Sequence, residues 1–335
     1  MGTFAAIVLA LGVVNSILLI VLAARRYWLA NDSRRHDEVA SRLRPNVLAF
    51  LDGDEELPDD LPRRERTIVA GILSGYGRLV RGPGRERIAA YFEQHGDIER
   101  ELDTMRNDRA HWRRAGAAFR LGDIGSPLAE QALIDALGDE DRDVRSAATR
   151  SLGCLRSIDG IGPLIAAVAD DRVPTALARW AVLQVGAPAL PELRNLLQSD
   201  SADRRAGAVM LIGHLGDAAD AELIEERLHD ASAAVREEAA RALGRIGGSR
   251  SVPWLVAALS DRVPGVRASA ASALGRLRAD AVPPLLLLAD HDQFDVARAA
   301  AQAAAHIDLE ATAFAAGMKG ASPHLLEAVD KARLA

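Results

Sequence analysis

The chain has 335 residues, with 41 Lys and Arg against 47 Asp and Glu, so its formal net charge is −6. Hydrophobic residues make up 49% of it, which supports an extensive core and excludes disorder over most of the chain. The acidic balance argues against nucleic-acid binding, and the single cysteine, Cys154, excludes an internal disulfide framework and a cysteine-based zinc site.

Residues 4–24 carry no charged side chain, and as a helix they are long enough to cross the roughly 30 Å hydrocarbon core of a bilayer. Arg25 and Arg26 follow this run, and no basic side chain precedes it. We therefore expect a single-pass anchor at residues 1–26, in contact with the lipid bilayer, with its N-terminus outside and the rest of the chain in the cytoplasm. A cleavable signal peptide is the alternative, but the segment before the run is uncharged and the run is longer than such peptides use.

Three residues inside this span are of the kinds that bring membrane helices together. Gly12 and Ser16 are small residues four positions apart, and Asn15 is a polar residue near the middle of the membrane. Small residues allow close approach, and an amide hydrogen-bonds across an interface. They predict contact with another transmembrane helix, the alternative being a chance pair in a segment rich in Ala and Gly.

Residues 27–111 form a juxtamembrane segment. An acidic linker at 52–62, with two prolines, predicts a solvated break. Helical periodicity follows at about 63–81, 85–95 and 97–107, and Gly82-Pro83-Gly84 separates the first two of these helices. The sequence leaves open whether these helices are part of the region that follows.

A repeat of about 30 residues occupies residues 112–335. Each copy carries an apolar residue that opens a short motif such as LGDIG or LGRIG, and an alanine four residues earlier. The apolar starts are Leu121, Leu152, Val182, Ile212, Leu243 and Leu274, and a worn seventh copy lies near Ala304. The alanines are Ala117, Ala148, Ala178, Ala208, Ala239 and Ala270.

The first half of each copy is a second helical segment, often opened by proline, as in PELRNLL at 191–197 and PWLVAAL at 253–259. Each copy is thus a helix pair that must stack on its neighbours to bury its apolar faces. The predicted fold is all-α: one transmembrane helix, a helical juxtamembrane segment, and an α-solenoid of about six to seven helix pairs.

Three segments carry the resemblance of this repeat to a known family: VRSAATRSLGCL, VREEAARALGRIG and VRASAASALGRL. It resembles the short HEAT-like repeats of bacterial scaffold proteins and of the bilin-lyase group, over about residues 112–308. Together with the anchor, the chain also looks like membrane-anchored HEAT-repeat proteins of high-GC bacteria, some of which are associated with membrane glycosyltransferases. The resemblance implies the bacterial cytoplasmic membrane as location and a membrane enzyme of that class as partner.

Two series of charged residues keep the repeat register. Aspartates fall between the paired helices at Asp139, Asp170, Asp200, Asp230, Asp261 and Asp290, and arginines open the second helices at Arg114, Arg145, Arg205, Arg236 and Arg267. Thr175 interrupts the arginine series. Because catalysis requires a unique pair of acids, we interpret these series as structural: carboxylates at helix N-termini, and guanidinium forks to a neighbouring repeat.

No catalytic, cofactor or metal site is predicted. The eight histidines show no metal-ligand spacing, and Cys154 has no matched histidine or acid that would make it a nucleophile.

A candidate binding surface lies on the second helices, two residues before and two residues after each apolar start, where side chains are expected to point away from the stack. We call this surface the ridge; its pairs are Phe119/Asp123, Arg150/Cys154, Trp180/Gln184, Met210/His214, Arg241/Arg245 and Ser272/Arg276. The HEAT resemblance implies that second helices line the concave face. Aromatic, Met and Arg side chains are typical of interface cores, so we predict partner binding by Phe119, Arg150, Trp180, Met210, Arg241 and Arg245. The alternative is that Phe119, Trp180 and Met210 only pack on neighbouring repeats.

These features predict a membrane-tethered, non-enzymatic scaffold or accessory subunit that binds a protein partner. One alternative is an enzyme of the bilin-lyase kind, which the repeat type suggests but the anchor disfavours. The other is a ligand-responsive membrane sensor, which the sequence does not separate from a passive scaffold.

Overall fold

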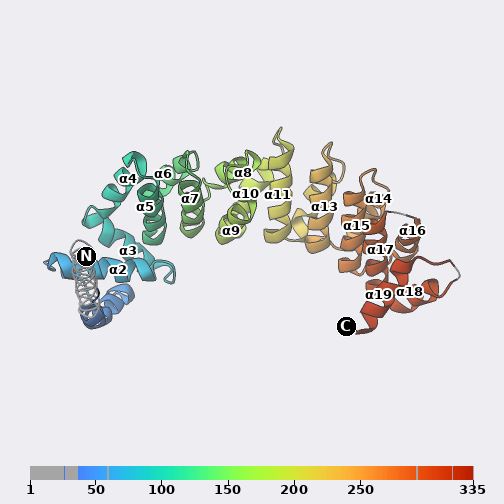
Figure 1. Ribbon diagram of the computed structural model, residues 1–335, viewed down its shortest axis with the longest axis horizontal. Helices are drawn as coiled ribbons and strands as arrows, with labels where there is room; N and C mark the ends of the chain where they lie inside the picture. Colours follow the sequence, from blue (N-terminus) through green and yellow to red (C-terminus); the bar gives the residue numbers. More distant parts are fainter. Residues whose placement is uncertain (1–25, 27–36, 59, 292, 319, 335) are drawn as a thin grey trace, which may run out of the picture. The chain divides into compact units, whose positions relative to one another are not determined.

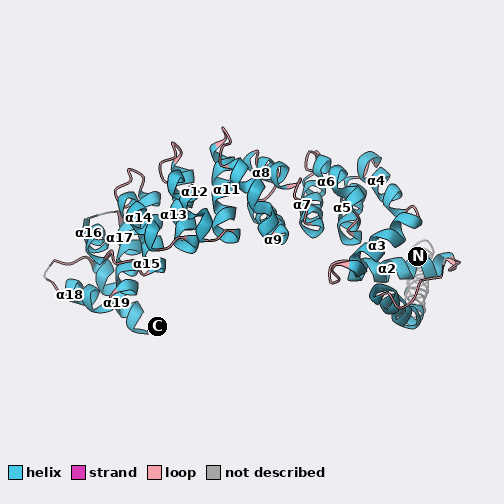
Figure 2. Ribbon diagram, turned by 180° about the vertical axis from the view of Figure 1, so that it is seen from behind, coloured by secondary structure: helices cyan, strands magenta, loops and turns pink. Residues whose placement is uncertain are grey.

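The computed structural model describes residues 26, 37–58, 60–291, 293–318 and 320–334, and every regular element in these ranges is a helix (Figure 2). The all-α prediction is confirmed for them. Within the same ranges, no helix combines the length and the apolar character needed to cross a bilayer. The predicted span at residues 4–24, with Gly12, Asn15 and Ser16, lies outside the described residues and stays a prediction.

Contacts divide the chain into two units. The N-terminal unit holds the described residues up to Glu101 together with Asp123–Ser126, and the repeat unit holds Leu102–Gly122 and Pro127 onward.

The N-terminal unit is built from a helix at residues 37–52, α2 (Arg63–Tyr76) and α3 (Pro83–Gln94), followed by α4 (Asp97–Asn107). Val47, Ile68 and Ile88 are buried in its core. α3 starts at Pro83 directly after Gly82, whose φ of 62° favours glycine. α2 ends earlier than the predicted residue 81, at a point where the chain approaches other backbone: a side chain at Gly77 would lie 1.8 Å from the Asp123 carbonyl oxygen.

The repeat unit is a row of helix pairs (Figure 1). Its second helices are α5 (His111–Ile124), α7 (Arg142–Leu155), α9 (Thr175–Val185), α11 (Ala202–Leu215), α13 (Ala233–Ile246), α15 (Pro264–Leu277), α17 (Phe294–Ile307) and α19 (Pro323–Leu334). From α11 to α17, each second helix packs on the next.

The first helices are shorter, and four of them begin with a 3-10 turn. They are η1 (Pro127–Ala129) with α6 (Glu130–Ala136), α8 (Ile161–Ala169), η2 (Ala187–Ala189) with α10 (Leu190–Leu196), η3 (Ala218–Asp220) with α12 (Ala221–Arg227), η4 (Ser249–Ser251) with α14 (Val252–Ala258), α16 (Val282–His291) and α18 (Leu309–Ala316). α18 and α19 form a last pair that the short sequence motif does not mark.

The buried register of the second helices follows the sequence pattern. The apolar starts from Leu121 to Leu274 are at most 1% exposed, and the alanines four residues earlier are at most 4% exposed. Ala300 and Ala304 of α17 are fully buried at the same positions, so the seventh copy is present. Close packing leaves no room for a larger side chain at the alanine positions.

Glycines make a second contact between neighbouring second helices, which we call the glycine contact. The residue after the apolar start is glycine in most copies, and an added Cβ there would lie within 3.0 Å of a small residue on the next second helix. The pairs are Gly122 with Ser151, Gly153 with Ala181, Gly213 with Ala242, Gly244 with Ala273, and Gly275 with Ala303.

Arginines make a third contact, which we call the fork. Arg236 donates from Nε and Nη2 to Asp261 of the next repeat at 2.7 and 3.0 Å, while its Nη1 donates to the Asp230 carbonyl of its own loop at 2.9 Å. Arg205 holds Asp230 in the same way, and Arg114 holds Asp139. Each of these aspartates also accepts the backbone N–H two residues later, at 2.8 Å. The predicted structural role of these residues is therefore confirmed in three repeats.

Three predicted members of the aspartate series, Asp170, Asp200 and Asp290, are not bound in forks; opposite Asp200 the arginine position is Thr175. Arg145 donates from Nε to the Arg172 carbonyl at 2.7 Å, and Asp170 caps the end of α8. Asp290 instead accepts the backbone N–H of Ser322 at 3.0 Å. The forks join residues 25 apart, so the position matching Arg267 is residue 292, which lies outside the described residues.

Candidate functional site

The ridge begins with an aromatic and arginine pair. Phe119 on α5 is 38% exposed, and the Arg150 guanidinium of α7 lies 3.8 Å from the centre of its ring. A guanidinium over an aromatic face is attracted by the ring's quadrupole. The pair thus fixes the orientation of both side chains across two successive repeats while leaving part of the ring accessible.

Trp180 on α9 is also 38% exposed and lies against the preceding repeat. Its Cζ3 atom would be 2.9 Å from a Cβ placed on Gly153, so the glycine makes room for the indole. Phe119 and Trp180 therefore combine the two alternatives left open by the sequence: each packs on a neighbouring residue, and each keeps over a third of its surface exposed.

Met210 on α11 is half-buried beside a small apolar cleft. The cleft has a volume of about 30 Å³ and lies between α8, α9 and α11, with Ile165, Val182 and Leu211 among its walls. A flexible thioether at such an edge adapts to different contacting shapes.

The ridge continues with two arginines on α13 that have different surroundings. Arg241 is ion-paired with Glu237 and with Glu238, the latter at 2.5 Å. Arg245 is exposed, and its Nη1 atom lies 3.1 Å from the position of a Cβ on Gly213. The pKa of Arg245 is lowered by partial desolvation beside the α11 helix and next by the nearby positive charge of Arg276.

One member of the ridge departs from the prediction. Asp123 was expected to point away from the stack, but it is 6% exposed in the N-terminal unit, where its carboxylate lies 3.6 Å from Arg78 Nε. The contact involves residues far apart in the sequence, so the repeat register gave no signal of it.

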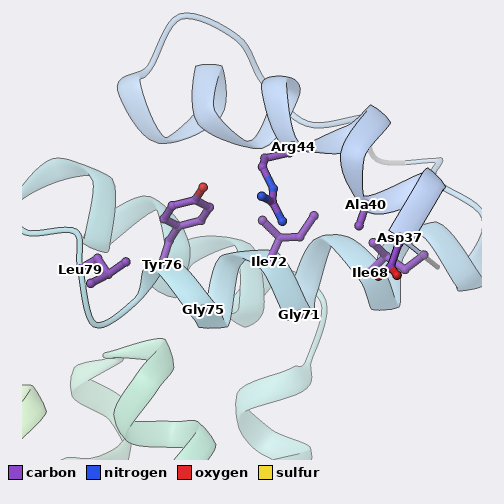
Figure 3. Close-up of a pocket in the computed structure, with 9 residues that line it drawn as sticks. All are labelled: Asp37, Ala40, Arg44, Ile68, Gly71, Ile72, Gly75, Tyr76 and Leu79. Atoms are coloured by element: carbon purple, nitrogen blue, oxygen red, sulfur yellow. The ribbon is translucent and has the colours of Figure 1, made fainter. Parts of the chain in front are cut away.

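A groove in the N-terminal unit was not anticipated. It lies between the helix at residues 37–52 and α2, with a volume of about 550 Å³ (Figure 3). Ile72 and Tyr76 of α2 line it together with Gly71 and Gly75, and Arg44 reaches in from the other helix. The Gly-xxx-Gly spacing on an amphipathic helix was the available signal.

No group of three or more His, Cys, Asp or Glu side chains that could hold a metal ion occurs in the described part of the chain. His214 contacts the backbone, with Nδ1 2.8 Å from the Met210 carbonyl oxygen, and His229 packs edge-on against Trp254. Cys154 is partly exposed on α7. The ridge is therefore a surface of aromatic, thioether and guanidinium groups, suited to contact with another macromolecule.

Comparison with known proteins identifies the family to which these repeats are similar. The sequence profile for HEAT repeats matches residues 100–184 and 221–306, together just over half of the chain. A HEAT repeat-containing taxis protein from Halobacterium salinarum is 29% identical over 126 residues, which are 37% of this chain and 28% of that protein. The chain thus aligns with less than a third of that relative's length.

One solved structure is similar at the level of the fold. Kap121p is 14% identical with a TM-score of 0.53, over 79% of this chain and 34% of that one. The CpcE and CpcF complex of phycocyanin lyase from Nostoc is 18% identical over 76% of this chain and 98% of that one, but its TM-score of 0.28 is too low to support an argument. The profile match and the stacked helix pairs together show that this chain belongs to the HEAT-repeat family.

Proposed function

We propose that this protein is a non-enzymatic, membrane-tethered scaffold or accessory subunit whose repeat unit binds a protein partner through the ridge. HEAT repeats commonly bind proteins, and the chain belongs to that family. The partner-binding residues are Phe119, Arg150, Trp180, Met210, Arg241 and Arg245. In this proposal they face the concave side of the solenoid.

The observation that carries the proposal is that Phe119 and Trp180 are partly exposed while their rings are held in place by packing. Both rings are 38% exposed, Phe119 on α5 and Trp180 on α9, with α7 between them. α7 supplies the contact for each ring: the Arg150 guanidinium lies over Phe119, and Gly153 makes room for Trp180. Aromatic and arginine side chains that are fixed before binding lose little conformational entropy on association, and such residues supply most of the energy of protein interfaces.

The tether rests on the sequence alone. Residues 4–24 would hold the repeat unit at the cytoplasmic face of a bacterial membrane, where Gly12, Asn15 and Ser16 would contact a helix of the partner. A membrane enzyme such as a glycosyltransferase fits both contacts. Two linked contacts raise the effective concentration of the second, so each can be weak on its own.

The first test compares two double variants of the full-length protein in affinity capture from detergent-solubilised native membranes. Trp180→Ala with Arg241→Gln changes the ridge. The matched control, Trp254→Ala with Arg250→Gln, changes a tryptophan 42% exposed on α14 and an arginine of the adjoining η4. We expect the ridge variant to lose the partner by tenfold or more and the control to retain it. Equal capture by both, with unchanged circular dichroism, contradicts the proposal.

A second comparison separates the tether from the ridge. Capture with the full-length protein is compared with capture by a chain that lacks residues 1–26. A membrane enzyme recovered only with the full-length protein supports a contact within the bilayer, whereas one recovered with both supports recognition by the ridge alone. Capture of nothing above background by either chain contradicts stable scaffolding.

A further inference from the structure

A row of basic residues runs along the C-terminal half of the ridge and into the next repeat, and the proposed function uses only one of them, Arg245. They occupy the same place in four successive second helices, two residues after the apolar start: His214, Arg245, Arg276 and His306. All four side chains are exposed. We call this row the basic ladder.

The glycine contacts set the positions of the two arginines. Arg245 Nη1 lies 3.1 Å from where a Cβ on Gly213 would be, and Arg276 Nη1 lies 3.5 Å from the corresponding point on Gly244. Each guanidinium therefore extends over the glycine of the preceding repeat, and the two are displaced by one repeat. The spacing of the charged groups follows the spacing of packed helices, which is about 8–10 Å.

The positive charges of the two ladder arginines are only partly offset by nearby carboxylates. Among the described residues, neither Arg245 nor Arg276 makes an ion pair. The nearby carboxylates of Glu237 and Glu238 are bonded to Arg241. The pKa of Arg245 is lowered first by burial and next by repulsion from the positive charge of Arg276, while Glu238 acts in the opposite direction. An anionic ligand would relieve this repulsion.

We propose that the basic ladder binds an extended, carboxylate-rich segment of the partner protein. This inference rests on the proposed function, because it assigns a chemistry to the partner that the ridge binds. A chain in the polyproline II conformation advances about 3.1 Å per residue with three residues per turn. Acidic side chains at every third position therefore share one face and recur about once per repeat of the ladder. Guanidinium forks suit carboxylates geometrically.

Carboxylates fit the surroundings better than the phosphates of a nucleic acid. The whole chain has a net charge of −6, and Glu237 and Glu238 lie beside the ladder. A nucleic acid carries a dense, extended field of negative charge and needs a broad basic surface to bind. A short acidic segment needs only the local charge of the ladder.

The test measures fluorescence anisotropy of a labelled peptide of about a dozen residues, with Glu at every third position and Ser and Gly between. The full-length protein is titrated at low salt and again at about 0.3 M salt, which screens exposed charges. A peptide with Gln in place of each Glu is the ligand control. We expect the Glu peptide to bind at least tenfold tighter than the Gln peptide at low salt, and high salt to reduce this difference.

The protein variants are chosen to change the same total charge at different places. Arg245→Gln with Arg276→Gln removes the arginines of the ladder, and Arg250→Gln with Arg262→Gln removes two exposed arginines outside it. We expect the ladder variant to bind the Glu peptide about tenfold more weakly and the control variant to stay within about twofold of the parent. Equal affinities of the two variants, or no preference for Glu over Gln, overturn the inference.

Two further probes decide the class of anion. If single-stranded DNA of equal charge, or vesicles with anionic lipid, bind the ladder more tightly than the Glu peptide, the assignment to a carboxylate-rich protein segment is wrong. Capture of the native partner separates this inference from the proposed function. A ladder variant that still captures the partner, when Trp180→Ala with Arg241→Gln does not, removes the inference and leaves the ridge function standing.

Discussion

Two junctions of the repeat unit show how differently neighbouring repeats are joined. Between α13 and α15, Arg236 forks Asp261, and Gly244 lies against Ala273. Between α9 and α11, the fork position is Thr175 and the glycine position is Leu183. Both of the repeated contacts are therefore replaced at the same junction.

The consequences are visible in the packing. α9 has 11 residues where the second helices on either side have 14, because Pro174 disfavours a helical conformation at Val173. α9 and α11 pack on each other less extensively than α13 and α15, and the apolar cleft beside Met210 lies between them. The profile match is also interrupted here, from residue 185 to residue 220. Because the stability of a solenoid is a sum over repeats and their interfaces, this junction couples its two sides more weakly.

The largest expected effect comes from removing a fork. Asp261→Ala leaves the guanidinium of Arg236, whose side chain is 7% exposed, without its carboxylate, and we expect it to cost about 3–5 kcal/mol. Asp200→Ala is the matched control, because Asp200 holds the same position at the α9–α11 junction opposite Thr175. We expect it to change stability by no more than about 0.5 kcal/mol. Urea unfolding measures the change in the free energy of unfolding, and hydrogen exchange shows which helices lose protection. Similar losses of stability in both variants would contradict the comparison of the two junctions.

Filling a glycine contact is expected to have the next largest effect. The new Cβ of Gly213→Ala would lie 2.6 Å from Ala242 Cβ and 2.8 Å from its Cα, so backbone must move, at a cost of about 1–3 kcal/mol. Gly248→Ala is the control, because no atom lies within 4 Å of its added Cβ. Thermal unfolding of the two variants side by side tests this, and a Gly213→Ala protein as stable as Gly248→Ala would show that the glycine contact is dispensable.

Acid should weaken the junctions that have forks. The hydrogen bonds from Arg205 and Arg236 lower the pKa of Asp230 and of Asp261. Their stabilising contribution is therefore complete above the unfolded-state pKa of about 3.9 and is lost as the pH falls through the lowered folded-state pKa. The free energy of unfolding of the parent, measured from about pH 6 to pH 3, should fall more steeply below pH 4 than that of Asp230→Asn. Parallel curves for the two proteins would contradict this linkage.

The smallest effect is a gain. Thr175→Arg places a guanidinium at the fork position facing Asp200, and we expect it to stabilise the α9–α11 junction by about 0.5–1 kcal/mol. Combining it with Asp200→Ala should abolish the gain, which a double-mutant cycle measures. A gain that persists without Asp200 would show that the new arginine acts in another way.

The sequence determined most of the repeat unit, because its information is periodic. One apolar start and one alanine per copy, such as Leu243 and Ala239, define a face that only a neighbouring helix can bury, so the helix pairs, their order and their stacking follow directly. The structural role of the arginine and aspartate series was predictable for the same reason. The last pair, α18 and α19, was not, since it lacks the short motif that marks the other copies.

The tertiary structure decided what depends on contacts between distant residues. Burial of Asp123 beside Arg78, the groove at Gly71 and Gly75, and the position of Arg150 over Phe119 all join residues whose separation leaves no local pattern. Exposure was likewise undecided by the sequence: a helical register tells which side chains share a face, but only the packed neighbours determine how much of Phe119 and Trp180 remains accessible. The repeat thus predicted the order of the ridge residues along the solenoid, and tertiary packing determined which of their surfaces stay exposed.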